Sequence, residues 1–83
     1  NPFNPTTTIP VAIPRESRIR LEVYNVLGQL VATLHDGNIS PGRHFFAWDG
    51  KNTQGATLSS GVYFSRLSVN GGVTLVGKMN LIK

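Results

Sequence analysis

Short segments in which apolar and polar residues alternate predict that this chain forms β-strands. A period of two places every second side chain on the same face of a strand. The segments that show this alternation most clearly are 8–13, 18–23, 43–48 and 73–81. No segment keeps apolar residues three to four positions apart over the length of a helix. The pattern therefore predicts an all-β chain.

Residues typical of turns separate these segments at close intervals, and counting between them predicts seven strands. The expected strands are 6–13, 18–25, 29–35, 43–48, 56–59, 62–69 and 73–82. Asn70-Gly71-Gly72 is the strongest hairpin signal, since these residues accept positive φ angles, and it is expected to join the last two strands as antiparallel neighbours. Pro10 lacks an amide donor, which predicts a sheet edge for the first strand.

Seven short strands in 83 residues favour two packed sheets, because a single sheet would leave one apolar face in water. Tyr63, two residues after Gly61, is predicted to form a tyrosine corner, in which the hydroxyl returns to nearby backbone. Trp48 alternates with apolar neighbours and is expected in the core. We predict a seven-stranded antiparallel immunoglobulin-like or fibronectin-like β-sandwich, formed by residues 1–83 as one domain.

The composition excludes several classes of protein. There is no cysteine, so neither a disulfide nor a thiolate metal site is available, and no apolar run is long enough to span a membrane. The formal net charge is +4, yet only Arg15, Arg18 and Arg20 cluster. Glu16 and Glu22 are interleaved with them, which predicts cross-strand pairing on a solvated face rather than binding of nucleic acid.

The residues that catalysis needs are few and poorly placed for it. His35 and Asp36 are neighbours on a predicted strand, so they should point to opposite faces, and Asp36-Gly37 is expected to form a turn. His44 shares the predicted core face with Trp48 and is interpreted as a hydrogen-bonded structural residue. We therefore expect no enzyme activity and no cofactor.

The segment from Asp49 to Gly55 invites a comparison with calcium-binding loops. The EF-hand loop needs an oxygen ligand at its third position and glycine at its sixth, where this chain has Lys51 and Gln54. The segment is instead expected to be a structural loop, in which Asp49 and Asn52 accept hydrogen bonds from their own backbone. No metal site is predicted.

Several motifs in a fixed order carry a resemblance to known families. They are Asn1-Pro2-Phe3-Asn4-Pro5, Val23-Tyr24-Asn25-Val26-Leu27-Gly28-Gln29, Trp48-Asp49-Gly50, Ser60-Gly61-Val62-Tyr63-Phe64 and Lys78-Met79-Asn80-Leu81-Ile82-Lys83. Together they resemble the C-terminal sorting domain, type A, of proteins exported by the bacterial type IX secretion system. They also resemble the related immunoglobulin-like domain of flagellar hook-capping proteins. In this set Trp48, Asp49, Gly50, Gly61 and Tyr63 are expected to be structural.

The resemblance to the sorting domain implies a non-catalytic secretion signal at the C-terminus of a larger secreted precursor. Its expected partners are the type IX outer-membrane translocon, a sortase-like surface protease and an N-terminal cargo domain in the same precursor. The expected route leads through the periplasm to the cell surface or extracellular space of a Gram-negative bacterium. The chain is expected to be a monomer and to bind no nucleic acid. The residues expected to contact the translocon are Lys78, Met79, Leu81, Ile82 and Lys83.

Other roles stay open at this point. Met79 and Leu81 fall on the predicted core face, so packing is an alternative role for both. The whole chain could also be an accessory spacer or a carbohydrate-binding module of a secreted multidomain enzyme. A structural role in assembly, of the hook-capping kind, is the third possibility.

Overall fold

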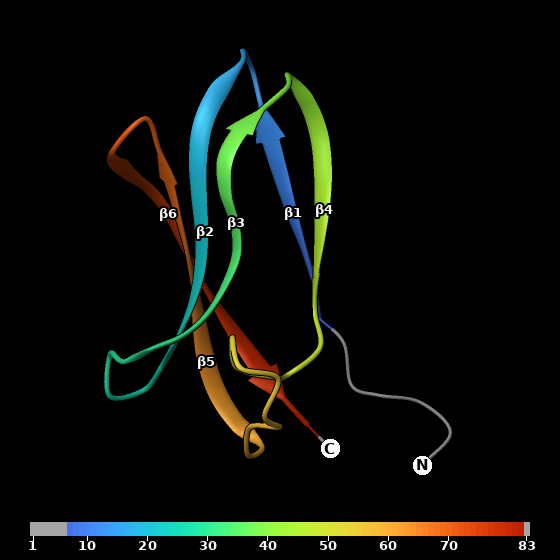
Figure 1. The fold of residues 1–83 in the computed structure, drawn as a ribbon, viewed down its shortest axis with the longest axis vertical. Helices are drawn as coiled ribbons and strands as arrows, with labels where there is room; N and C mark the ends of the chain where they lie inside the picture. The colour runs from blue at the N-terminus through green and yellow to red at the C-terminus, as the bar shows by residue number, and fades with distance from the viewer. Residues whose placement is uncertain (1–6, 83) are drawn as a thin grey trace.

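The structure is a computed structural model that describes residues 7–82, and this part of the chain contains six β-strands and no helix (Figure 1). The strands are β1 (Thr7–Ile13), β2 (Ser17–Asn25), β3 (Leu30–Ile39), β4 (Gly42–Trp48), β5 (Gly61–Val69) and β6 (Gly72–Leu81). The all-β prediction is confirmed. No helix able to cross a membrane is found over the same residues.

The six strands form two antiparallel sheets. β1 pairs with β4, and the other four strands follow the order β3-β2-β5-β6. The prediction of a seventh strand at 56–59 is wrong, because this segment makes only an isolated bridge between Lys51 and Thr57. Local bonds hold the segment as a loop instead, among them the one that the Leu58 amide donates to the Gly50 carbonyl oxygen at 2.9 Å.

The third strand is longer than the sequence pattern predicted. Asp36-Gly37 is not a turn, since β3 continues through both residues to Ile39. Gly37 has a φ of 157°, which is extended backbone, and it lies opposite Ile19 in β2. Asp36 lies opposite Arg20, so a residue type that often marks turns here contributes a charge to the face of the sheet.

Two predictions, of an edge strand and of a hairpin turn, are confirmed. Pro10 lies in β1, whose neighbour within the described residues is β4 alone, so the proline occupies an edge strand. Asn70 and Gly71 connect β5 to the antiparallel β6 with φ angles of 51° and 88°. Positive φ at both central residues is the geometry of a tight hairpin turn.

Two clusters of buried apolar side chains form the core, and strands of both sheets contribute to each. The members of the first cluster are Val11, Ile13, Ile19, Leu21, Ile39 and Leu67. The members of the second are Val23, Ala32, Trp48, Tyr63, Met79 and Leu81. Burial of these faces away from water is the main force that holds the two sheets together.

The hairpin end of β6 lies outside this core. Leu75 alternates with the buried Met79 along the sequence of β6, but it is exposed. It lies opposite the buried Leu67, at the edge of the four-stranded sheet. Figure 1 shows the hairpin between β5 and β6 displaced from β1 and β4, so the smaller sheet does not cover this position.

The tyrosine corner is confirmed. Tyr63 is buried in the second core cluster, and its hydroxyl donates a hydrogen bond to the Ser59 carbonyl oxygen at 2.7 Å. The bond joins the start of β5 to the segment that leads into it, which fixes how the chain enters the four-stranded sheet.

Replacing Tyr63 by phenylalanine is expected to lower the free energy of unfolding by about 1 kcal/mol, the usual net value of one hydrogen bond. The ring and its packing stay, so the loss reports the hydroxyl alone. Urea denaturation followed by circular dichroism measures it. An unchanged midpoint would show that the corner does not stabilise the fold.

Candidate protein-binding surface

The five residues expected to be structural gather near the end of β4 and the start of β5. The rings of Trp48 and Tyr63 meet edge to face, with centroids 5.1 Å apart. The Trp48 indole Nε1 donates to the Lys51 carbonyl oxygen at 3.0 Å, and Asp49 Oδ1 accepts from the Lys51 amide at 3.1 Å. Gly50 is buried beside them, and Gly61 is the first residue of β5. Their contacts are with the protein's own core and loop, which supports the structural interpretation.

The segment from Asp49 to Gly55 is a structural loop, as predicted, and its Thr53 amide also donates to the Val31 carbonyl oxygen in β3 at 3.0 Å. Asn52 Oδ1 accepts from the Ala56 amide at 2.9 Å, and Gly50 and Gly55 have positive φ angles of 76° and 86°. Its side-chain oxygens therefore bond the backbone. Within residues 7–82 no group of three or more histidine, cysteine, aspartate or glutamate side chains is placed to hold a metal ion.

The residues predicted to contact a translocon do not form one surface. Met79 and Leu81 are buried in the second core cluster, Leu81 to 2% exposure, so their side chains pack inside the protein. Lys78 is exposed on the opposite face of β6, and Ile82 is 76% exposed just beyond the strand. Lys83 lies outside the described residues. The alternative role of packing applies to Met79 and Leu81.

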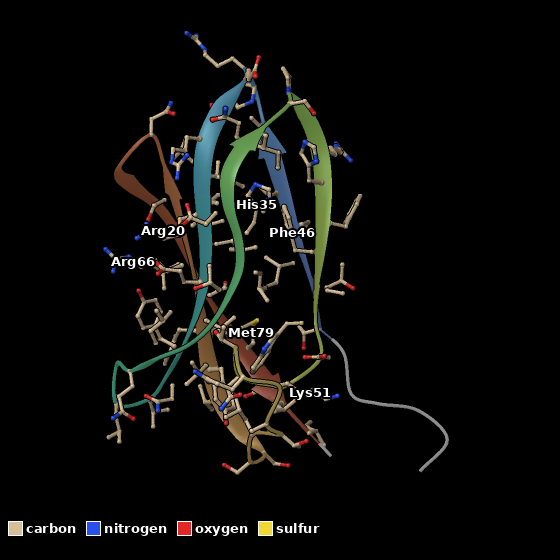
Figure 2. All side chains as sticks on the ribbon, viewed as in Figure 1. Arg20, His35, Phe46, Lys51, Arg66 and Met79 are labelled. Carbon is tan, nitrogen blue, oxygen red and sulfur yellow. The ribbon has the colours of Figure 1, made fainter. Side chains whose placement is uncertain are left out.

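Both histidines lie near the Phe46 ring, and within residues 7–82 neither forms a hydrogen bond or ion pair with an acidic side chain. His35 packs against Phe46, with ring centroids 5.5 Å apart, while its neighbour Asp36 faces the opposite side of the sheet. Figure 2 shows His35 and Phe46 pointing toward one another between the sheets. His44 shares a 2.8 Å hydrogen bond between its Nε2 atom and the Ser40 carbonyl oxygen. Both predictions, of opposite faces and of a hydrogen-bonded His44, are confirmed.

The outer face of the four-stranded sheet, which is turned away from β1 and β4, carries both charged and apolar side chains. Figure 2 shows Arg20 and Arg66 on this side. Arg18 and Arg20 reach Asp36 across the strands, with N–O distances of 3.3 and 3.5 Å. The prediction that these arginines pair with Glu16 and Glu22 is therefore wrong. Asp36 was not predicted as their partner because the sequence pattern placed it in a turn.

Glu22 has a different role from the one predicted. It is only 7% exposed, and its Oε1 atom accepts a hydrogen bond from the Tyr24 hydroxyl at 3.0 Å. In the strand register Glu22 lies opposite Arg66, but no ion pair joins the two side chains. Because Glu22 is buried, its carboxylate is not part of the exposed charge of the face.

Beside the charged residues lies an apolar area, which we call the outer patch. It lines a surface hollow of about 380 Å³ together with Asn25 and Gly28. The outer patch consists of Tyr24, Val26, Phe64, Arg66 and Val76. Val26 is 66% and Val76 59% exposed, which is unusual for side chains that gain free energy by leaving water. Exposed apolar patches rimmed by polar residues are typical of interaction sites.

A rigid loop between β2 and β3 presents Val26 to solvent. Asn25 Oδ1 accepts hydrogen bonds from the amides of Leu27 and Gln29, both at 3.0 Å. The backbone amide of Asn25 donates to the Gln29 carbonyl oxygen at 3.0 Å, and Gly28 turns the chain with a φ of 79°. A surface that is already ordered loses less conformational entropy when it binds a partner.

Replacing Asn25 by alanine is expected to lower the free energy of unfolding by about 1–2 kcal/mol, because two amide hydrogen bonds are lost from an exposed loop. Thermal denaturation measures the loss. Hydrogen exchange of the Leu27 and Gln29 amides should rise in the variant while exchange in β5 stays slow. Equal protection of both amides before and after the change would contradict this account of the loop.

The sequence analysis did not identify the residues of the outer patch. Val26 and Leu27 stand in a segment that the pattern assigned to a turn, and apolar residues inside a turn are a usable signal for an exposed contact. Phe64 and Arg66 alternate with core residues in β5, so their outward direction was readable, but nothing in the sequence showed which strands lie beside them.

A second apolar area lies on the outer face of the two-stranded sheet. Phe45 is 68% exposed there, with Pro10, Ala12 and Arg43 around a shallow hollow of about 220 Å³. Its lining has no hydrogen-bonded loop comparable to the one that supports the outer patch. We call this area, formed by Pro10, Ala12, Arg43 and Phe45, the control surface.

The exposed patch of apolar residues and arginine on this all-β fold is the candidate surface for contact with another protein. The chain belongs to the family of FlgD Ig-like domains, whose model matches residues 5–72. It is 32% identical over 77 residues to the basal-body rod modification protein FlgD of Salmonella typhimurium strain LT2, an alignment covering 88% of this chain and 33% of that protein. The proteins of the same name from Salmonella typhi and Escherichia coli K12 show the same identity and coverage. The chain thus spans about a third of the length of these relatives.

These findings correct the function predicted from the sequence. Of the two resemblances, the one to the immunoglobulin-like flagellar domain is confirmed, and the one to the sorting domain is not shown. The predicted secretion signal is contradicted, because the relatives are flagellar basal-body proteins. The type IX translocon, the surface protease, the cargo domain and the route to the cell surface are wrong for the same reason. The spacer and carbohydrate-binding alternatives find no support either.

Proposed function

We propose that the chain is a non-catalytic assembly domain of a flagellar protein, which acts by binding other proteins during construction of the basal-body rod. The observation that carries this proposal is the family match, which extends over most of the chain. The names of the relatives supply the biological setting, since each is called a basal-body rod modification protein. Because the chain spans about a third of those relatives, we infer that it is one domain of a longer protein.

A binding role fits the side chains better than a catalytic one. His35 faces an aromatic ring, His44 bonds a backbone oxygen, and Asp36 is paired with arginines on the other face. General acid–base catalysis requires such groups to converge on one substrate atom. The outer patch offers instead tyrosine and arginine, which are enriched where proteins bind one another.

We further infer that the two sheets form an immunoglobulin-like sandwich. Support comes from the two core clusters, each built from strands of both sheets, and from the corner made by Tyr63. Such a sandwich is a rigid scaffold, and its loops and outer faces remain free for contacts.

Deletion of residues 7–82 from the chromosomal gene tests the proposal. We expect cells that make the shortened protein to lose their flagella, counted by electron microscopy, and to stop swimming. Re-expression of the full-length protein should restore both. Normal flagella in cells that contain the shortened protein at the usual level would contradict a role in assembly.

A further inference from the structure

We propose that the outer patch binds a segment of a partner protein in which an aspartate or glutamate stands next to apolar side chains. The inference rests on the proposed function and specifies the chemistry of the partner. Its central observation is an exposed arginine without an ion-pair partner, set among apolar and aromatic side chains.

Arg66 is the cation available to such a partner. Arg18 and Arg20 already bond Asp36, whereas Arg66 makes no ion pair with any residue that the structure describes. The one carboxylate opposite it, Glu22, is buried and holds the Tyr24 hydroxyl. A guanidinium can bond both oxygens of a carboxylate at once, which gives direction as well as affinity.

The neighbours of Arg66 are apolar on the side toward the hollow. Val76 lies opposite it in β6, and Phe64 precedes it by two residues on the same face of β5. Tyr24 lies opposite Phe64 in β2, and Val26 closes the hollow from the rigid loop. An apolar side chain of the partner placed here would remove several exposed carbon atoms from water.

The charge of the whole outer face also favours an acidic partner. Among the side chains that the structure describes, the exposed basic residues of this face are Arg18, Arg20, Arg66 and Lys78, and its one exposed carboxylate is Asp36. The apolar hollow favours a protein segment over a nucleic acid, because the lining offers a single unpaired arginine rather than a track of cations.

Site-specific photocrosslinking in the full-length protein, in its own bacterium, tests this inference. The photoreactive residue p-benzoylphenylalanine replaces Val76 in one strain and, on the control surface, Phe45 in another. Adducts are identified by mass spectrometry of the crosslinked peptides. We expect the adduct from position 76 to contain a flagellar-protein segment with aspartate or glutamate within about three residues of an apolar residue.

The second arm tests the role of Arg66 directly. Arg66→Glu is expected to lower the yield of the position-76 adduct about tenfold or more, since the incoming carboxylate would then meet a like charge. Arg43→Glu, the same change at an exposed arginine of the other sheet, should leave the yield within about twofold. Circular dichroism establishes that both variants are folded.

The possible failures separate the two proposals. A flagellar adduct from position 45 but none from position 76 overturns the binding site and leaves the assembly role standing. No flagellar adduct from either position overturns both. The site is also overturned if position 76 labels only lipid, polysaccharide or a segment without acidic residues, or if Arg66→Glu leaves the yield unchanged.

Discussion

Replacing Trp48 by alanine is expected to lower the free energy of unfolding by about 3–5 kcal/mol, the range measured for large aromatic residues in protein cores. The side chain is fully buried, meets Tyr63 edge to face, and belongs to the cluster that includes Met79 and Leu81 of β6. A domain of this size has a total stability of roughly 4–12 kcal/mol. The expected loss is therefore a large share of the total, and it should appear as a marked fall in the urea midpoint, which circular dichroism measures.

Trp48→Phe is the matched control. It keeps an aromatic ring in the core but removes the indole donor that bonds the Lys51 carbonyl oxygen. We expect a loss of about 1–2 kcal/mol, from one buried hydrogen bond and a small cavity. If Trp48→Ala changed stability by less than 1 kcal/mol, the tryptophan would not be the residue that joins β4 to the rest of the core.

Replacing Gly50 by alanine is expected to destabilise the fold by about 2–4 kcal/mol, because two unfavourable effects combine. Its φ of 76° lies in the left-handed region, which residues with a Cβ atom rarely adopt. The new Cβ would also lie 2.9 Å from Cδ1 of Leu81, whose side chain is packed in the core and has little room to move. Thermal unfolding of the variant measures the combined loss.

Gly55→Ala separates these two effects. Gly55 has a similar φ of 86°, but no heavy atom lies within 4 Å of the added Cβ. We expect this change to lower stability by only about 1–2 kcal/mol, from backbone strain alone. Equal losses at the two glycines would mean that the contact between the loop and the last strand contributes nothing.

The strands that could be predicted from the sequence were those with a clear alternation. The segments containing Val11 and Leu21 bury one face and expose the other, as their pattern indicated. The sequence prediction failed where the structure of a segment depends on the strands that lie beside it or over it. Asp36 and Gly37 favour a turn locally, but pairing with β2 extends the strand through them. Leu75 has a core-like position in its strand, yet the smaller sheet does not reach it.

The binding surface was harder to predict than the structural residues. Tyr63 and Asn52 bond backbone groups close to them in sequence, so local chemistry was enough to predict these hydrogen bonds. The outer patch joins β2, β5, β6 and a loop, and its composition follows from strand order. Strand order is set by long-range packing, which a pattern along the chain does not record.

The predicted C-terminal contact residues illustrate the same limit. Alternation correctly placed Met79 and Leu81 on one face of the last strand. The sequence of this motif, however, fits side chains packed in the core as well as side chains that contact a partner. Burial of both side chains assigns them to packing. On the other face of the same strand, Lys78 was among the predicted contact residues, whereas Val76, which lies opposite Arg66, was not.

Flagellar number per cell, counted in the deletion strain after complementation with point variants of the full-length gene, tests the central claim most directly. The claim is that the chain acts in flagellar assembly through the outer patch. It predicts that Arg43→Glu restores flagella to the normal number and that Arg66→Glu does not, with both proteins folded and equally abundant. Normal flagella in cells that carry Arg66→Glu would contradict it.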